Sequence, residues 1–313
     1  MKKVSTILVA LGGNAILQPK QRGTYLEQLE NVQICSETLV ELFMAGHKLV
    51  ITHGNGPQVG HLLIQNEQTA DLIPPLPLHN CVAQTQGQIG LLLQLCLDNA
   101  FRARGLNVQS TAIVTRTLVD ANDEAFRKPT KPVGPFFSED YAKIRTKLGE
   151  TWINDSNRGW RRVVASPQPR KILEHNSIKY LLEKHGVVIA VGGGGVPVIE
   201  QDQQLVGVDA VIDKDLASSL LAQELELDTF AILTDVSSVK LNFGQLNEEK
   251  VAHLSVHEAE HHLLAGQFGV GSMAPKIQAS INFIKAGGTR AIITSFEQLL
   301  PALQGKAGTI IVP

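Results

Sequence analysis

Six short apolar runs, spread over almost the whole chain and separated by helical patterns, are the feature that most limits the possible folds. The runs are rich in β-branched residues and cover residues 4–11, 48–53, 109–115, 187–192, 229–234 and 290–294. Continuous apolar runs of this length are typical of parallel strands that are buried on both faces. Because strands and helices alternate, the sequence predicts an α/β fold with an open, mostly parallel sheet flanked by helices.

Helical periodicity fills the intervals between these runs. After the first run, apolar residues recur near every 3.6 positions at Leu26, Leu29, Val32, Leu39 and Phe43. Further helices are expected over 84–104, 176–185, 213–226 and 273–286.

Residues 120–170 interrupt this alternation. They contain five prolines, both tryptophans and many charges. We expect an inserted subdomain of about these residues, with a small core of Phe136, Phe137, Trp152 and Trp160. The chain is then divided into an N-terminal lobe, 1–206, which includes the insertion, and a C-terminal lobe, 207–313.

Composition excludes several classes of protein. The formal net charge is -2 and no basic block is present, which argues against nucleic-acid or anionic-membrane partners. The three cysteines, Cys35, Cys81 and Cys96, are scattered, which favours a reducing compartment over a disulfide framework or a thiolate metal site. Residues 1–11 resemble a short signal peptide, but the apolar run ends at Gly12, so we predict a buried first strand in a soluble protein.

Three glycine clusters directly follow predicted strands. They are Gly12-Gly13-Asn14, Gly54-Asn55-Gly56-Pro57 and Gly192-Gly193-Gly194-Gly195. Glycine lets the backbone approach a ligand and point N–H groups at an anion, and the carboxyl ends of parallel strands meet at one edge of a sheet. One such cluster alone indicates a tight turn, whereas three at equivalent positions indicate a binding site.

Standard nucleotide motifs are missing from the sequence. No G-x-x-x-x-G-K-S/T motif is present, which excludes a P-loop protein. The partial matches to G-x-G-x-x-G at Gly54 and Gly269 lack the third glycine, so dinucleotide binding is weakly supported.

Charged residues suited to phosphate lie later in the chain. Asp213-Lys214-Asp215 opens one predicted helix, and Lys276 lies in the first turn of another, after an expected N-cap at Ser272 and after Pro275. Lys131 stands between two prolines on a stiff, extended segment. Each lysine alone is most simply a surface charge, but together with the glycine loops they indicate a phosphate site.

One motif suggests different chemistry. His257-Glu258-Ala259-Glu260-His261 matches the H-E-x-x-H pattern of zinc proteases. A second charge lies inside the motif and Leu264 replaces the glycine of the extended pattern, so a solvated helix face is the better interpretation.

Taken together, the motifs resemble those of carbamate kinases, which are members of the amino-acid-kinase superfamily. The resemblance covers essentially the full length in order and spacing. Lys131 is its most specific point, because the subdomain that carries it is of the carbamate-kinase type, and Ala10 stands where related kinases for glutamate or acetylglutamate place a lysine. The matching segments are residues 10–15, 53–60, 129–135, 192–197, 213–215 and 271–276.

The resemblance implies a three-layer sandwich and reversible phosphoryl transfer between ATP and carbamate, in arginine or related nitrogen catabolism. It implies that residues 1–206 bind carbamate and the phosphoryl group and that 207–313 bind the nucleotide. It also implies ATP or ADP with Mg²⁺, small-molecule substrates, a homodimer and a cytoplasmic location.

The resemblance also implies roles for individual residues. Lys131, Lys214, Asp215 and Lys276 would be catalytic, with Asp215 orienting the lysines. Hydrogen-bond donors to carbamate and the phosphoryl group would be Gly12, Gly13, Asn14, Gly54, Asn55, Gly193 and Gly194. Nucleotide contacts would come from Lys214, Asp235, Met273 and Lys276, and Mg²⁺ would be held by nucleotide oxygens and water, without a metal site built by the protein.

Two residues depart from the family pattern, and three alternatives stay open. Ala274 replaces a common glycine, and Lys240 stands where relatives carry an aromatic residue, which puts adenine affinity in question. The alternatives are a sister kinase acting on another small carboxylate, a nucleotide-binding paralogue with little turnover, and the zinc hydrolase.

Overall fold

The computed structural model describes residues 5–18, 20–155, 159–269 and 271–313. The first residue of the predicted strand 4–11, the signal-peptide-like Met1–Lys3 and position 270 after Gly269 lie outside the described residues. None of the described helices is long and apolar enough to cross a membrane.

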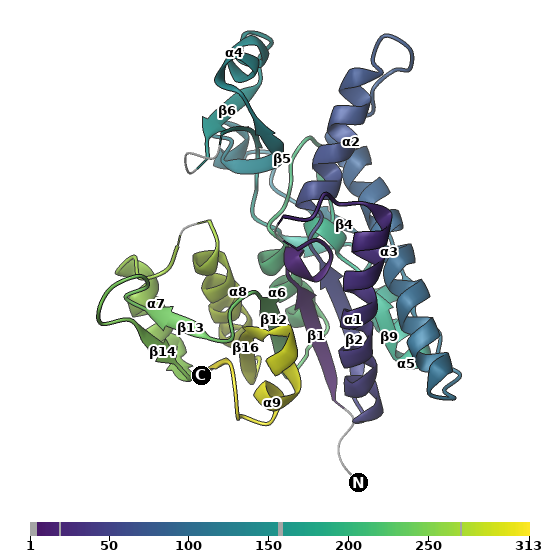
Figure 1. Ribbon diagram of the computed structural model, residues 1–313, viewed down its shortest axis with the longest axis vertical. Helices are drawn as coiled ribbons and strands as arrows, with labels where there is room; N and C mark the ends of the chain where they lie inside the picture. Colours follow the sequence, from purple (N-terminus) through teal and green to yellow (C-terminus); the bar gives the residue numbers. More distant parts are fainter. Residues whose placement is uncertain (1–4, 19, 156–158, 270) are drawn as a thin grey trace.

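An eight-stranded sheet forms the centre of the molecule, in the order β15-β17-β16-β12-β1-β2-β9-β3 (Figure 1). The six predicted runs all lie in it and run parallel, which confirms the predicted α/β class. They form β1 (Thr6–Leu11), β2 (Lys48–His53), β3 (Thr111–Ala112), β9 (Val187–Ile189), β12 (Thr229–Thr234) and β16 (Arg290–Ser295). The opposite-running β15 (His253–Ser255) and β17 (Thr309–Val312) complete one edge and were not predicted.

Side chains of β1 alternate between two buried cores, which creates three layers. Ile7, Val9 and Leu11 face one core, whereas Leu8 and Ala10 face the other. Helices α1 (Tyr25–Met44), α3 (Leu78–Ala103) and α9 (Leu299–Leu303) cover the first face. Helices α5 (His175–His185), α6 (Lys214–Glu224), α7 (Val256–Leu264) and α8 (Met273–Lys285) cover the second. Each buried aliphatic side chain contributes about 1.5–3 kcal/mol, so these cores hold the sheet rigid beneath its loops.

Two helix features differ from the predictions. Helix α2 (Gly56–Gln68) was not predicted, because it buries only Gln58, Val59 and Gly60 and shows no apolar stripe. Ser272 does precede α8, but its side chain makes no capping hydrogen bond. The carbonyl of Gly269 instead accepts from the N–H groups of residues 272–274.

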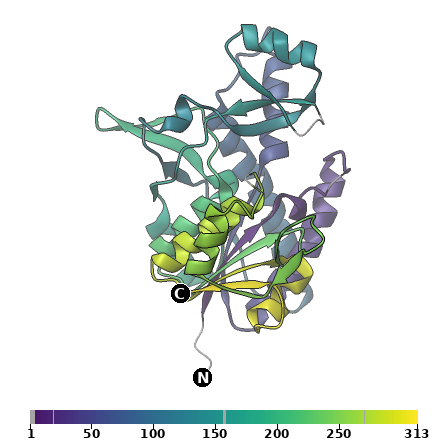
Figure 2. The ribbon, with the colours of Figure 1, turned by 90° about the vertical axis from the view of Figure 1, so that its left-hand side faces the viewer.

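The insertion forms a separate small sheet that stands above one end of the main sheet (Figures 1 and 2). Its strands are β5 (Lys131–Phe137), β6 (Thr151–Asn154) and β7 (Trp160–Val164), and α4 (Glu139–Lys147) packs on them. The Phe137 ring stacks on Tyr141 at 4.5 Å, and Trp152 meets both rings edge-on. Phe136 differs from the expectation, since it is 40% exposed and lies under the Arg161 guanidinium. We call residues 131–164 the subdomain.

Two smaller sheets complete the fold. One is formed by β4 (Arg116–Leu118), β8 (Lys171–Ile172), β10 (Val196–Gln201) and β11 (Gln204–Gly207), and the other by β13 (Val239–Leu241) and β14 (Glu249–Val251). A third apolar cluster joins the foot of the subdomain to α2 and α3 through Val59, Val82, Val133 and Val164.

Candidate functional site

A cleft of about 1050 Å³ opens beyond the carboxyl ends of β1, β2 and β12. Every predicted site residue lines it except Gly194. Ligand sites of open α/β sheets lie at this edge, where the loops after neighbouring strands meet. The structure therefore gathers residues from Gly12 to Lys276 around one space.

Two glycines of these loops lie so close to neighbouring segments that side chains would not fit. A Cβ added to Gly12 would lie 2.6 Å from the carbonyl oxygen of Leu233. Gly193 has φ +64°, and a Cβ there would lie 2.2 Å from Nδ2 of Asn55. That amide is already fixed, since Nδ2 donates to Oγ1 of Thr85 at 2.8 Å. Glycine thus lets the first loop lie against the end of β12 and the third loop lie against Asn55 of the second, with Gly12 and Gly193 both at the cleft wall.

Gly194 lies behind this wall. Its carbonyl accepts a hydrogen bond from Oγ1 of Thr117 at 2.8 Å, and a Cβ would lie 2.5 Å from the carbonyl oxygen of Ile212. The geometry gives Gly194 a packing role next to Gly193 rather than a place on the cleft wall. Adjacent glycines look alike in the sequence, so only the structure separates the two.

Three helices begin at the cleft. The first residues of α2, α6 and α8, which are Gly56, Lys214 and Met273, all line it. The helix dipole gives each of these ends a partial positive charge, although the first N–H groups of α6 and α8 already donate to Asp213 and to the carbonyl of Gly269. The cleft is therefore built to receive an anion.

Two aspartates tie together three lysines from distant parts of the chain. Oδ1 of Asp215 lies 2.5 Å from Nζ of Lys214, and its Oδ2 lies 2.8 Å from Nζ of Lys276. Asp213 accepts from Nζ of Lys131, in the subdomain, at 2.7 Å. Three ammonium groups and two carboxylates leave one net positive charge, which suits a phosphate.

The sequence assigned no role of its own to Asp213, which the structure places in this cluster. Its Oδ1 accepts from the N–H groups of Asp215 and Leu216 and so caps α6, while Oδ2 holds Lys131. An aspartate at the start of a helix is ordinarily explained by capping alone. The partner on the subdomain is 82 positions away, so no local signal reveals it.

Burial and charge act against each other within this lysine–aspartate cluster. Burial alone would raise the pKa of Asp215, but the two ammonium groups outweigh it and hold this pKa well below its usual range. Burial lowers the pKa of Lys214, and the neighbouring charge of Lys276 acts in the same direction. Burial also opposes ionisation of Lys276, but Asp215 outweighs it and raises that pKa. Asp215 is consequently ionised at physiological pH.

His53 supports the second glycine loop as a neutral side chain. Burial lowers its pKa to about 4. Its Nδ1 lies 2.9 Å from the carbonyl oxygen of Gly54, to which the ring donates. The ring also fills the space in which a side chain at Gly192 would lie, 2.4 Å from Nε2. His53 therefore shapes the loop and adds no charge to the cleft.

The lining of the cleft also includes residues that differ in character from the lysine–aspartate cluster. Asp235 and Met273 line the cleft together with Lys240 and Phe243. Lys240 pairs with Glu248 at 2.5 Å, and its Nζ lies 5.8 Å from the centre of the Phe243 ring. Phe243 is 72% exposed, which is unusual for a large aromatic side chain. The cleft thus has an aromatic ring at Phe243, three positions after Lys240, which itself stands where relatives carry an aromatic residue.

The H-E-x-x-H segment lies on α7, outside the cleft. Glu258 forms a capping box with Ser255 and so has a local structural use. His257 and His261 are exposed. In the described part of the chain, no three His, Cys, Asp or Glu side chains gather as a metal site. The pattern is explained by a capped, solvated helix.

Comparison with known proteins agrees with this geometry. Residues 5–295 match the model of the amino acid kinase family. Carbamate kinases of Thermococcus kodakarensis and Pyrococcus furiosus are each 47% identical to the chain, over 98% of it and over 98% and 99% of their own lengths. A structure of carbamate kinase from Giardia lamblia bound to AMP-PNP is 43% identical, covers 100% of this chain and 99% of its own, and superimposes with a TM-score of 0.92. The chain therefore belongs to the amino acid kinase family.

Proposed function

We propose that the chain is a carbamate kinase, which transfers a phosphoryl group reversibly between ATP and carbamate. The observation that carries this proposal is the Lys131–Asp213 ion pair, which brings the subdomain lysine to the Lys214–Asp215–Lys276 cluster. Near-half identity to carbamate kinases over the full length supports the same reaction.

The reaction needs alignment and charge neutralisation more than covalent chemistry, because phosphoryl transfer passes through a loose transition state. In the ATP-forming direction, a terminal oxygen of ADP bonds to the phosphorus of carbamoyl phosphate, and the bond from phosphorus to the carbamoyl oxygen breaks. Carbamate leaves and decomposes to ammonia and carbon dioxide. Backbone N–H groups of the loops at Gly12 and Gly54 hold the carbamoyl end.

The three lysines act on the phosphoryl group and on its acceptor. Lys131 exchanges its contact with Asp213 for an oxygen of the phosphoryl group in flight. Lys214 and Lys276 neutralise the nucleotide phosphates, while Asp215 keeps both ammonium groups aimed into the cleft. Positively charged helix ends add to this field without reorganisation during the reaction.

Mg²⁺ would enter with the nucleotide. Asp213 and Asp215 already accept ammonium groups and α6 N–H groups, so the phosphate oxygens and water are the natural ligands of the ion. When bound, it supplies further neutralisation between the phosphates of ADP or ATP. Residues 207–313 would carry the nucleotide, and 1–206 the carbamoyl end. We also propose a homodimer and a cytoplasmic location, as in the family resemblance.

We expect Phe243 to stack on the adenine and so to replace the aromatic residue that relatives carry at the position of Lys240. Phe243→Ala is then expected to raise KM for ADP roughly 5–150-fold, since base–aromatic stacking is worth about 1–3 kcal/mol, with little change in kcat. Leu246→Ala is the matched control, because this exposed side chain in the same loop does not line the cleft. An unchanged KM for ADP in Phe243→Ala would remove the stacking role.

The proposed function is tested by ATP formation from ADP, Mg²⁺ and carbamoyl phosphate. Acetyl phosphate and the acyl phosphates of glutamate and acetylglutamate serve as competing donors. We expect carbamoyl phosphate to have the highest kcat/KM. A higher value with another acyl phosphate would indicate the sister kinase, and ADP binding without turnover would indicate the nucleotide-binding paralogue.

A further inference from the structure

The subdomain rests on helix α2 at two separate places. The first is at its foot, where Gly134 of β5 meets Gly60 of α2. A Cβ on Gly60 would lie 2.2 Å from Cα of Gly134, so the two backbones are in direct contact. Val59 and Val133 are buried beside this contact. The strand that begins with Lys131 is thus pressed against α2 only three residues later.

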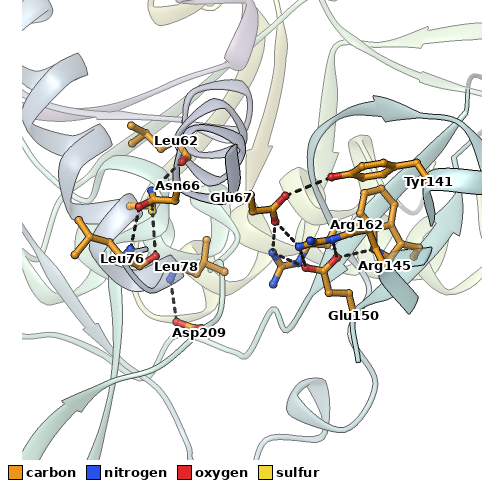
Figure 3. A network of polar contacts seen from close by, with 12 residues as sticks. Leu62, Asn66, Glu67, Leu76, Leu78, Tyr141, Arg145, Glu150, Arg162 and Asp209 are labelled. Carbon is orange, nitrogen blue, oxygen red and sulfur yellow. Dashed lines mark hydrogen bonds and ion pairs between the residues drawn. The ribbon is translucent and has the colours of Figure 1, made fainter. Parts of the chain in front are cut away.

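The second place is the far end of α2, where Glu67 faces the outer part of the subdomain (Figure 3). Glu67 accepts from Nη2 of Arg145 at 2.8 Å, lies 3.5 Å from Nη1 of Arg162, and accepts from the hydroxyl of Tyr141 at 3.4 Å. Its three partners come from α4 and β7. In Figure 3 their polar ends converge on this one carboxylate.

Inside the subdomain, Glu150 holds the two arginines in place. It accepts from Nε and Nη2 of Arg145, at 3.0 and 2.5 Å, and lies 3.4 Å from Arg162. Trp152 adds a hydrogen bond through its indole N–H at 2.9 Å. Burial acts to raise the pKa of Glu150, but these partners outweigh it and keep the pKa below its ordinary value. The arginines are therefore preorganised to receive Glu67.

The end of α2 is itself anchored to the main body. Asn66, next to Glu67, donates from Nδ2 to the carbonyl of Leu62 and accepts from the N–H of Leu76 at 2.9 Å. The N–H of Leu78 then donates to Asp209 at 3.0 Å. Glu67 is thus a fixed point on the main body, while Arg145 and Arg162 belong to the subdomain.

Helix α2 connects both contacts to the cleft, because its first residue, Gly56, lines the cleft and Glu67 lies in its last turn. Lys131 reaches the lysine–aspartate cluster from the subdomain. The angle between the subdomain and α2 therefore determines where the ammonium group of Lys131 lies. The glycine contact and the apolar cluster support the subdomain at its foot. The Glu67 contact supports it a second time at the far end of α2, and two separated contacts define an angle that one contact alone does not.

We propose that Glu67 is a positioning residue for the phosphoryl transfer, which holds the subdomain at the angle that places Lys131 in the cleft. This inference rests on the proposed function, since it assigns to Glu67 an effect on catalysis that runs through Lys131. Glu67 itself does not line the cleft.

The test is a double-mutant cycle of Glu67→Gln and Lys131→Ala in the ATP-forming assay. Glu67→Gln keeps the shape of the side chain and removes its charge. We expect kcat to fall roughly 10–100-fold with KM for ADP unchanged, since misplacement by about 1 Å costs up to about 10²-fold. In the Lys131→Ala background the same substitution is expected to change kcat less than twofold, because no lysine is left to misplace.

Glu139→Gln is the matched control. Glu139 lies on α4 within the subdomain, is exposed and pairs only locally with Lys143 at 2.9 Å. It is expected to keep wild-type kinetics. Wild-type kcat in Glu67→Gln would overturn the proposal, and so would an equal loss from Glu67→Gln in both backgrounds, because the effect would then not run through Lys131.

Fluorescence gives a readout that does not depend on activity. Both tryptophans of the chain, Trp152 and Trp160, lie in the subdomain. Glu67→Gln is expected to increase acrylamide quenching of their emission, because the subdomain loses its contact with the end of α2. An unchanged melting temperature shows that the variant is folded. Unchanged quenching would overturn the proposal. A different outcome is that the wild type has no kinase activity, while Glu67→Gln still increases the quenching. This would refute the proposed function but would support the Glu67 contact as a support of the subdomain.

Discussion

Replacing Lys131 by alanine is expected to lower kcat for ATP formation roughly 10²–10³-fold, the loss seen when one donor to a developing oxyanion is removed. Lys131 is the cation that the subdomain brings to the cleft, where it pairs with Asp213. KM for ADP is expected to stay near the wild-type value, because the nucleotide is held by Lys214 and Lys276. Steady-state kinetics with carbamoyl phosphate and ADP measures both parameters.

Lys128→Ala is the control for this prediction. Lys128 lies three positions earlier, is exposed and pairs with Glu124 within one turn. Removal of Lys131 leaves the cap of α6 by Asp213 in place, so the variant is expected to fold. A Lys131→Ala enzyme that keeps kcat within about threefold of wild type would show that the subdomain lysine does not act on the transition state.

Asp215→Asn is expected to lower both activity and the free energy of unfolding, the latter by about 3–5 kcal/mol. Asp215 is 4% exposed, and it is the shared counter-ion of Lys214 and Lys276, whose side chains are 13% and 15% exposed. An amide in its place leaves two buried like charges facing each other. Urea unfolding measures the stability loss, and kcat is expected to fall because neither lysine remains aimed at the phosphates.

The pH dependence of this loss follows from the lowered pKa of Asp215. A carboxyl group whose folded pKa lies below its unfolded pKa stabilises the protein fully above the unfolded value, near about 4, and loses that effect only as the pH falls further. The Asp215 carboxyl group of the wild type therefore stays ionised between about pH 6 and 8, and Asp215→Asn is expected to be less stable than the wild type throughout this range. Glu226→Gln, which removes an exposed charge just after α6, is the control. An Asp215→Asn protein as stable as this control would contradict the buried counter-ion role.

The main sheet was predictable because its central strands are buried on both faces. Each of the six apolar runs forms one of its strands, although the run at 109–115 shortens to the two residues of β3. The edge strand β15 has only three residues, of which one is buried, and β17 beside it has only four. Helix α2 escaped prediction because its buried face contains Gln58 and Gly60 in place of an apolar stripe. The periodicity of apolar residues thus reveals a helix that packs on the sheet. It does not reveal α2, where Gly60 packs against Gly134 of the subdomain.

The candidate site was predictable where its residues form short motifs that are continuous in the sequence. Glycine clusters after strands and lysines at helix starts located the cleft wall from Gly12 to Lys276. The pairing of Lys131 with Asp213 joins segments that are 82 positions apart, and the capping position of Asp213 conceals it. Phe243 gave no signal, since an aromatic residue in a polar loop acquires meaning only from the cleft beside it.

The central position of β1 also has a consequence for protein synthesis. β1 pairs with β2 on one side soon after it is made, but its other side pairs with β12, through Ile7 with Thr229 to Ala10 with Ile232. At about 5–20 residues per second, a ribosome needs roughly 10–40 s to make the intervening chain. During that time the nascent protein exposes an apolar strand edge, which is a template for intermolecular pairing. Productive folding in the cell therefore depends on shielding this edge until the second half of the sheet arrives.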